Sequence, residues 1–193
     1  MISVGANVNP NNHANTVFYQ SPLEYAVETD NIALIDLLID NGANIEAENV
    51  GGITALVSSA IDDRLQVAGH LVERGANISF VDSYGNNILH KVIWDIANWG
   101  QKHWKGDVPK TFKFMLMLDK TLLHQKNNDG YTPYMFACST GNQVFIDYLK
   151  TQGAYLHTIV DGKSCDDLCN SDQALALHGG CSPFAGIRIL TQL

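Results

Sequence analysis

A pair of short sequence blocks recurs along this chain at a fixed interval. "NGAN" at Gly42 returns as "RGAN" at Gly75, and Gly52 returns as Gly85, so both intervals are 33 residues. A later copy, "DGYTPYMFACSTGNQVFIDYLKTQGA", contains Gly130. Self-similarity at a fixed period of this kind indicates a repeat architecture, in which each unit buries its apolar face only against its neighbours. The repeat therefore constrains the fold more than any other feature of the sequence.

Each copy carries the start and stop signals of two short helices. Five polar residues stand immediately before an apolar-periodic run and are typical N-caps: Ser21, Thr54, Asn87, Thr132 and Ser164. Pro22 and Pro133 fall at the first helical position, where a missing N–H costs nothing. The second apolar run ends at glycines that fit left-handed C-caps: Gly42, Gly75 and Gly153. Because such short helices do not stand alone in water, we expect the pairs to stack into one continuous core.

These motifs resemble the ankyrin repeat family. Its first block is matched by "SPLEYA" (21–26), "TALVSS" (54–59), "NILHKV" (87–92), "YTPYMFA" (131–137) and "SCDDLC" (164–169). Its second block is matched by "ALIDLLIDNGAN", "QVAGHLVERGAN" and "VFIDYLKTQGA". The resemblance covers nearly the whole chain, although no copy has the family's T-P-L-H in full. It implies an all-α fold, an ankyrin-repeat solenoid of stacked helix-turn-helix repeats with protruding β-turn fingers.

The period divides residues 1–193 into one ankyrin repeat domain. The units we predict are a partial repeat at 1–16, repeats at about 17–49, 50–82, 83–127 and 128–160, and a C-terminal capping repeat at 161–193. Gly85 and Gly130 are 45 residues apart, which places an insertion near 98–110. Lys120 stands where the helix-closing glycine of that copy would fall. The chain opens in what matches the last turn of a second helix, and we therefore expect it to be a fragment of a longer protein.

Charge and hydropathy exclude several classes of function. The formal net charge is −8, and an acidic surface repels phosphate backbones, so we expect no nucleic acid partner. No run approaches the length of apolar residues that spans a membrane, and the N-terminus lacks a secretory signal. The four cysteines form no extracellular framework. We expect a cytoplasmic protein, or one of the host cytosol if it belongs to a secreted effector.

Four soft ligands near the C-terminus raise the possibility of a zinc site: Cys165, Cys169, His178 and Cys181. Their spacing matches no standard zinc pattern, and small buried slots accept free cysteine well. Cys138 follows the alanine slot of a packed helix, where a structural cysteine is inert. We therefore predict reduced cysteines, and no catalytic residue, cofactor or metal in this chain.

Two histidines have structural interpretations. His90 occupies the histidine slot of the family's first block, and the resemblance implies that it joins neighbouring loops by hydrogen bonds. His70 stands among the apolar positions of a second helix, which favours a satisfied core histidine over a ligand.

Ankyrin repeats bind partner proteins, and the resemblance implies a concave groove of fingertips and first helices. Its variable slots, with the tryptophans of the insertion, give the partner-binding residues that we predict: Phe18, Glu28, Ile53, Ile61, Asp62, Tyr84, Trp94, Asp95, Asp129, Tyr131, Trp99 and Trp104. These residues combine an apolar stripe with an acidic border. The partner that fits is another protein with apolar anchors and basic residues around them, bound by a chain that is monomeric on its own.

Two questions stay open at this stage. The insertion holds Trp99 and Trp104 among basic residues, and its tryptophans either pack back onto the second helices or form a binding surface. The chain is either a pure interaction module or the substrate-recruiting ankyrin domain of a larger enzyme, for example a bacterial effector.

Overall fold

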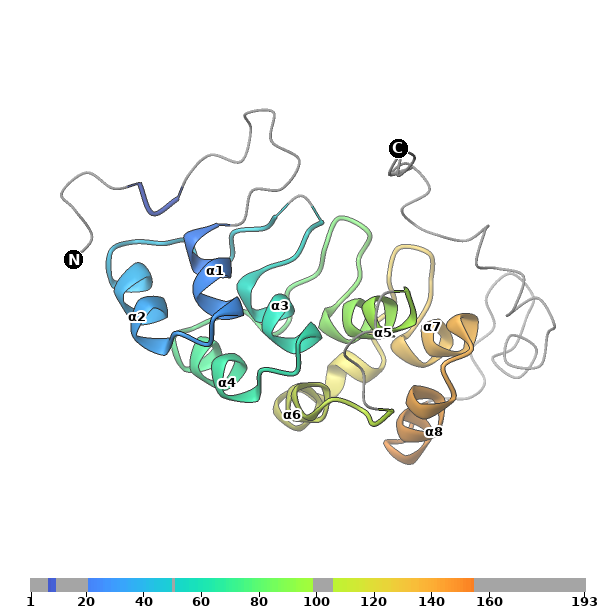
Figure 1. The fold of residues 1–193 in the computed structure, drawn as a ribbon. Coiled ribbons are helices and arrows are strands. Elements are labelled where there is room, and N and C mark those ends of the chain that lie inside the picture. Colours follow the sequence, from blue (N-terminus) through green and yellow to red (C-terminus); the bar gives the residue numbers. More distant parts are fainter. Residues whose placement is uncertain (1–6, 10–20, 50, 99–105, 155–193) are drawn as a thin grey trace, which may run out of the picture.

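The computed structural model describes residues 7–9, 21–49, 51–98 and 106–154. Four helix pairs follow one another along this part of the chain (Figure 1): α1 (Pro22–Glu28) with α2 (Ile32–Asp40), α3 (Ala55–Ile61) with α4 (Leu65–Glu73), α5 (Ile88–Asn98) with α6 (Lys110–Leu118), and α7 (Pro133–Thr140) with α8 (Gln143–Thr151). In the same part, β-structure is limited to one isolated bridge between Val81 and Asn87.

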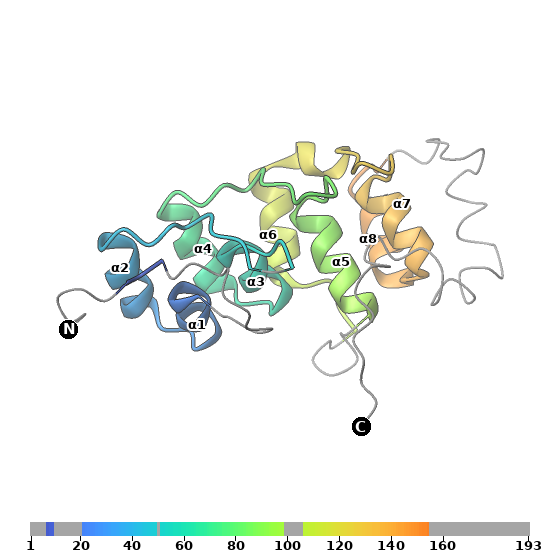
Figure 2. The same ribbon diagram turned by 90° about the horizontal axis from the view of Figure 1, so that it is seen from above.

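The helices form two layers joined by one core (Figures 1 and 2). The first helices α1, α3, α5 and α7 contact one another in sequence order, and α2, α4, α6 and α8 lie beside them as the second layer. The core between the layers is continuous from Leu23 to Ala154. The predicted all-α ankyrin solenoid is confirmed, because each helix pair buries its apolar face against the next pair.

The predicted N-caps start the first helices. Ser21 and Glu24 form a complete capping box on α1, and the Thr54 and Thr132 side chains accept bonds from Val57 and Met135. The side chain of Asn87 accepts from the backbone N–H groups of two residues in the first turn of α5, at 3.1 and 3.2 Å. Pro22 and Pro133 occupy first helical positions, as expected.

The second helices end in a shared hydrogen-bond pattern, with one exception. After α2, the Gly42 N–H donates to the Ile39 carbonyl and the Ala43 N–H donates to the Leu38 carbonyl, each at 2.9 Å. The same pair of bonds follows α4 and α8. At the end of α6, where the sequence has Lys120 in place of glycine, Asp119 is extended and the 3-10 helix η2 (Lys120–Leu123) follows.

The third pair differs at the predicted insertion. α5 has 11 residues against seven in α1 and α3, and residues 99–105 lie outside the described part of the chain. α6 starts against the preceding repeat, because the Asp63 carboxylate accepts bonds from the Thr111 N–H at 2.9 Å and from its hydroxyl at 3.0 Å. Thr111 also donates to the Ala60 carbonyl at 3.0 Å. These bonds restore the register of the stack after the insertion.

Each finger is closed by one polar side chain at its base. The side-chain oxygens of Asn49, Asp82 and Asn127 each accept two backbone N–H bonds, from the residues two and four positions later. Adjacent fingers are also joined, since the Asn128 N–H donates to the Tyr84 carbonyl at 2.9 Å. The fingers therefore form a connected row along one edge of the first-helix layer (Figure 1).

We predict that Gly85→Ala destabilises the chain more than Gly75→Ala. Both glycines have positive φ, 74° and 94°, so alanine costs about 1–2 kcal/mol at either position. Only at Gly85 would the new Cβ also collide with a neighbouring finger, 2.9 Å from the Asn128 backbone nitrogen, whereas nothing lies within 4 Å at Gly75. Chemical denaturation should give Gly85→Ala an additional loss of about 1 kcal/mol or more. Equal losses would contradict the finger contact.

Candidate partner-binding site

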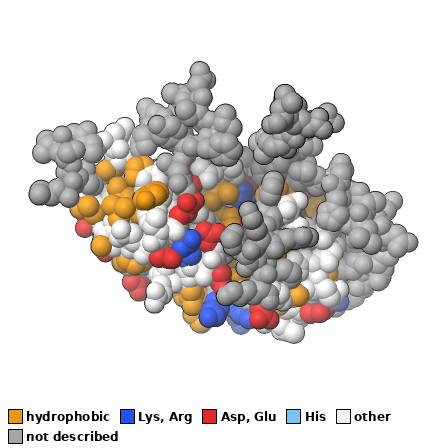
Figure 3. All heavy atoms as spheres, viewed as in Figure 1, with side chains coloured by type: hydrophobic (Ala, Val, Ile, Leu, Met, Phe, Trp, Pro, Cys, Tyr) orange, Lys and Arg blue, Asp and Glu red, His pale blue; other side chains and the backbone are white. Residues whose placement is uncertain are grey.

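The predicted binding residues lie on the fingers and the ends of the first helices, a surface we call the first-helix face. Glu28, Asp62, Tyr84 and Asp129 are exposed there, and Ile53, Ile61, Trp94, Asp95 and Tyr131 are half-buried. The other three predicted residues, Phe18, Trp99 and Trp104, lie outside the described residues. Hydrophobic side chains and a group of acidic and basic side chains lie next to one another on this face (Figure 3).

His90 holds the finger that Asn127 closes against α5. Its Nε2 donates to the Tyr131 carbonyl at 2.9 Å, and its Nδ1 faces the Asn87 backbone N–H at 3.3 Å and the Asn87 side-chain oxygen at 2.8 Å. Burial lowers the pKa of His90 to about 4, so the ring is neutral at pH 7. The loop-joining role that the resemblance implies for this histidine is present, and it fixes the backbone that carries Tyr131.

A buried ion pair joins the finger closed by Asn49 to the finger closed by Asp82. The sequence did not predict this contact. The Lys91 ammonium donates to the Gly51 carbonyl at 2.9 Å and to the Asp82 carboxylate at 3.2 Å, and both charged side chains are more than nine-tenths buried. The bonds to Gly51 and Asp82 direct the ammonium toward the finger bases. In a sequence, a lysine within an apolar helix pattern predicts a buried ion pair only when the carboxylate that it contacts is already known.

Arg64 forms a second set of ion pairs that the sequence did not predict. Its guanidinium contacts Asp30 at 2.6 Å and Asp62 at 3.1 Å, and so links the ends of α1 and α3. Asp62, predicted as part of an acidic border, is therefore already paired. The border is less acidic at this point than the sequence list indicates, and a cation from a partner would have to compete with Arg64.

Among the predicted acidic residues of this face, Asp95 is the one that is half-buried. It is half-buried on α5, and its carboxylate makes no hydrogen bond or ion pair in the part of the chain that the structure describes. Burial raises the pKa of Asp95 to about 6, with a further rise from Asp62 and an opposing effect of Lys91. At pH 7 the side chain is still mostly ionised, so the fold carries an incompletely compensated negative charge next to Trp94.

Trp94 lies less openly on this face than the sequence indicated. The ring is half-buried and packs against the hydrophobic core, so it contributes to the stack as well as to the surface. Ile53, Ile61 and Tyr131 pack against the same core while part of each side chain stays accessible. Together these residues offer apolar contact area on the first-helix face, which suits non-covalent recognition of an amphipathic group.

Metal chemistry finds no support in the described residues, where no group of three or more His, Cys, Asp or Glu side chains is placed to hold an ion. The zinc candidate formed by Cys165, Cys169, His178 and Cys181 lies outside them. Cys138 is buried within α7.

Comparison with known proteins agrees with the helical stack. The family model described as "Ankyrin repeat" matches residues 18–47. The chain is 26% identical over 141 residues to transient receptor potential cation channel subfamily A member 1 of Homo sapiens. It is 25% identical over 197 residues to subfamily V member 1 of Cavia porcellus. It is 30% identical over 90 residues to phosphocholine transferase AnkX of Legionella pneumophila.

These matches cover much of this chain and little of each relative. They span 72, 81 and 47% of this chain, but 12, 23 and 8% of the respective relatives. None of the helices in the described ranges is long and apolar enough to cross a membrane. The family match at residues 18–47 and the four stacked helix pairs show that this chain contains ankyrin repeats.

Proposed function

We propose that this chain is a protein-interaction module whose first-helix face binds a partner segment with an apolar anchor beside a lysine or arginine. Ankyrin repeats mediate protein–protein interaction. The residues assigned to binding are Trp94 and Asp95 at the centre, with Ile61, Tyr84 and Tyr131 around them.

The unpartnered carboxylate of Asp95 carries the proposal. Because the pKa of Asp95 is raised, keeping its ionised carboxylate half-buried has a cost that lowers the free energy of unfolding. A positively charged partner group would remove that cost, because it would provide the counter-ion that Lys91 and Arg64 do not supply. Residues that cost stability where they stand are expected at functional sites.

The apolar part of the site supports the same partner chemistry. Trp94 is next to Asp95 on α5, and tryptophan is enriched among residues that dominate binding energy. Tyr84, 36% exposed, and the half-buried Tyr131 stand on neighbouring fingers joined by backbone hydrogen bonds. A rigid, partly apolar surface around one charge favours a peptide or protein segment that offers both an apolar side chain and a cation.

A second candidate function keeps the same surface but changes its context. The relatives include a phosphocholine transferase and cation channels of which this chain matches only a small share. The module would then recruit a substrate or partner for a longer protein that performs the chemistry. In both cases the binding chemistry of the first-helix face is the property to test.

A random peptide library tests the proposal directly. Panning on the 193-residue chain should enrich peptides that place lysine or arginine within a few residues of a bulky apolar side chain. The basic peptides that bind the first-helix face should bind Asp95→Asn more weakly than the parent, and they should bind Tyr148→Ala as well as the parent, because Tyr148 belongs to the second-helix layer. Enrichment of acidic peptides, or a set of enriched basic peptides none of which binds Asp95→Asn more weakly, would refute the proposal.

We predict that Trp94→Ala weakens binding of the enriched peptide by roughly 2 kcal/mol or more, as at other interface hot spots. Because the ring also packs against the core, the variant should unfold more easily, by less than the about 3–5 kcal/mol of a fully buried aromatic. Titration calorimetry and a thermal melt measure the two effects. Unchanged binding in a folded variant would remove Trp94 from the site.

We predict that Asp95→Asn raises stability at pH 7 and weakens binding of the basic peptide. The substitution removes a charge whose burial is unfavourable, and it also removes the attraction for the partner's cation. In the unsubstituted chain, binding should weaken as the pH falls through about 6, the pKa of Asp95. An Asp95→Asn variant that binds as tightly as the parent, or that keeps this pH dependence, would contradict the assignment.

A further inference from the structure

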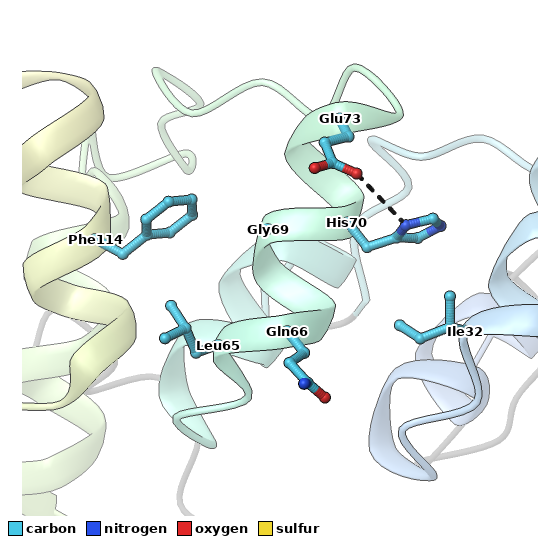
Figure 4. A pocket seen from close by; sticks show the side chains of 7 residues that line it. All are labelled: Ile32, Leu65, Gln66, Gly69, His70, Glu73 and Phe114. Carbon is cyan, nitrogen blue, oxygen red and sulfur yellow. Dashed lines mark ion pairs between the residues drawn. The ribbon is translucent and has the colours of Figure 1, made fainter.

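A hollow lies on the layer of second helices, away from the first-helix face. It is lined by Ile32 of α2, by Leu65, Gln66, Gly69, His70 and Glu73 of α4, and by Phe114 of α6, and it has a volume of about 530 Å³. Figure 4 shows Phe114 and Leu65 on one side of α4 and His70 with Ile32 on the other, so that the hollow crosses the helix at Gly69.

Gly69 has no evident purpose within the fold. It lies inside α4 and has no positive φ, and a Cβ added there would meet nothing within 4 Å. Glycine weakens a helix interior relative to alanine, so the position costs stability without a packing benefit. The fifth residues of α2 and α6 are Asp36 and Phe114, and the bare backbone at the fifth residue of α4 therefore opens the hollow between them.

The walls of the hollow are apolar and partly accessible. Leu65 is 37% exposed, and Ile32 and Phe114 are half-buried while packing against the core at their base. His70, which the sequence suggested as a satisfied core histidine, lies at the edge with its side chain 22% exposed and its Nε2 2.8 Å from the Asp36 carboxylate. The hollow has room for one bulky apolar side chain seated over Gly69.

The charged side chains at the edge of the hollow indicate which sign of charge a partner covering it would carry. Arg74 is occupied by Asp36 and Asp40, which its guanidinium contacts on α2. Glu73 lies 3.9 Å from His70 Nδ1, with which it forms an ion pair (Figure 4). The carboxylates of this edge are nevertheless its most exposed charges: the Glu73 and Asp40 side chains are 80 and 64% exposed, against 27% for Arg74. The accessible charge beside the apolar hollow is therefore negative, which complements a cationic residue on a partner.

We propose that this hollow is a second docking site, separate from the first-helix face, for a basic amphipathic helix of a partner protein. A leucine or aromatic side chain of that helix fills the space over Gly69, between Leu65 and Phe114. A lysine or arginine about one turn away on the partner pairs with Glu73. With sites on both layers, the module holds two partner segments at once.

A synthetic peptide tests this site independently of the proposed function. The probe is a labelled helical peptide with leucine at every third or fourth position and lysine on the flanks, followed by fluorescence anisotropy. Gly69→Leu, which fills the hollow, should weaken binding about tenfold or more, and Glu73→Gln should weaken it several-fold. Asp147→Leu, at the same register of α8, should leave binding unchanged. The loss on Gly69→Leu should persist when both chains also carry Asp95→Asn, which removes any binding of the basic peptide at the first-helix face. A peptide with glutamate in place of lysine should bind weakly.

Other outcomes overturn the proposal. Binding that survives Gly69→Leu but is lost in Asp95→Asn would place the peptide on the first-helix face, which would support the proposed function and reject this site. Sedimentation of the chain alone would reveal self-association, and its loss on Gly69→Leu would make a second copy the occupant. Gly69→Ala, which should fold at least as stably as the parent, provides a milder filling variant if the leucine variant does not fold. Absence of peptide binding also rejects the site.

Discussion

Buried polar contacts at the bases of the fingers set the register on which the rest of the stack depends. Lys91 joins the Gly51 carbonyl to Asp82, the Asn127 amide donates to the Asn86 side-chain oxygen at 2.9 Å, and His90 reaches the Tyr131 carbonyl. Each of these side chains joins one finger, or the helix beside it, to the next finger. Apolar helix faces alone tolerate sliding, whereas a buried donor that loses its acceptor carries the full desolvation cost. The finger row is thereby fixed, and so are the side chains it presents.

The local structure was predictable because its causes are local. An N-capping side chain acts on the backbone two or three residues away, and a left-handed glycine closes the helix that precedes it, so Ser21 and Gly42 reveal their roles in sequence alone. The period of 33 residues then fixes which helices become neighbours. Lys120 was a recognisable departure, but its consequence, an extended Asp119 followed by a 3-10 helix, depended on contacts that the sequence does not contain.

The sequence predicted which positions form the candidate site, but it did not predict the burial and the ion pairs of their side chains. Slots in the repeat place Trp94 and Asp95 on the first-helix face, but their burial follows from how α5 packs against its neighbours. Arg64 escaped notice because its two carboxylate partners lie 34 and two residues away, and only the stack brings them together. Asp95 became the more informative residue by comparison, since Arg64 neutralises Asp62, whereas the half-buried Asp95 has no ion pair within the described part of the chain.

Burial in the same stack shifts the pKa values of His90 and Asp95 in opposite directions. Burial lowers the pKa of His90 from 6.5 to about 4, so His90 contributes stability above pH 6.5 that is lost as the pH falls toward 4. Burial raises the pKa of Asp95 from 3.8 to about 6, so Asp95 contributes stability below pH 4 that is lost as the pH rises toward 6. Between pH 4 and 6 the two contributions oppose each other, because the unfolded chain releases a proton from one group and takes one up at the other.

Asp95→Asn should expose the histidine contribution. We expect the free energy of unfolding of this variant to fall more steeply than that of the parent between pH 6 and 4, since only the proton uptake by unfolded His90 remains. Denaturant titrations at pH steps across this range measure the slopes. Parallel profiles would mean that Asp95 titrates in the folded chain as it does in the unfolded one, and the strain that marks it as a binding residue would be absent.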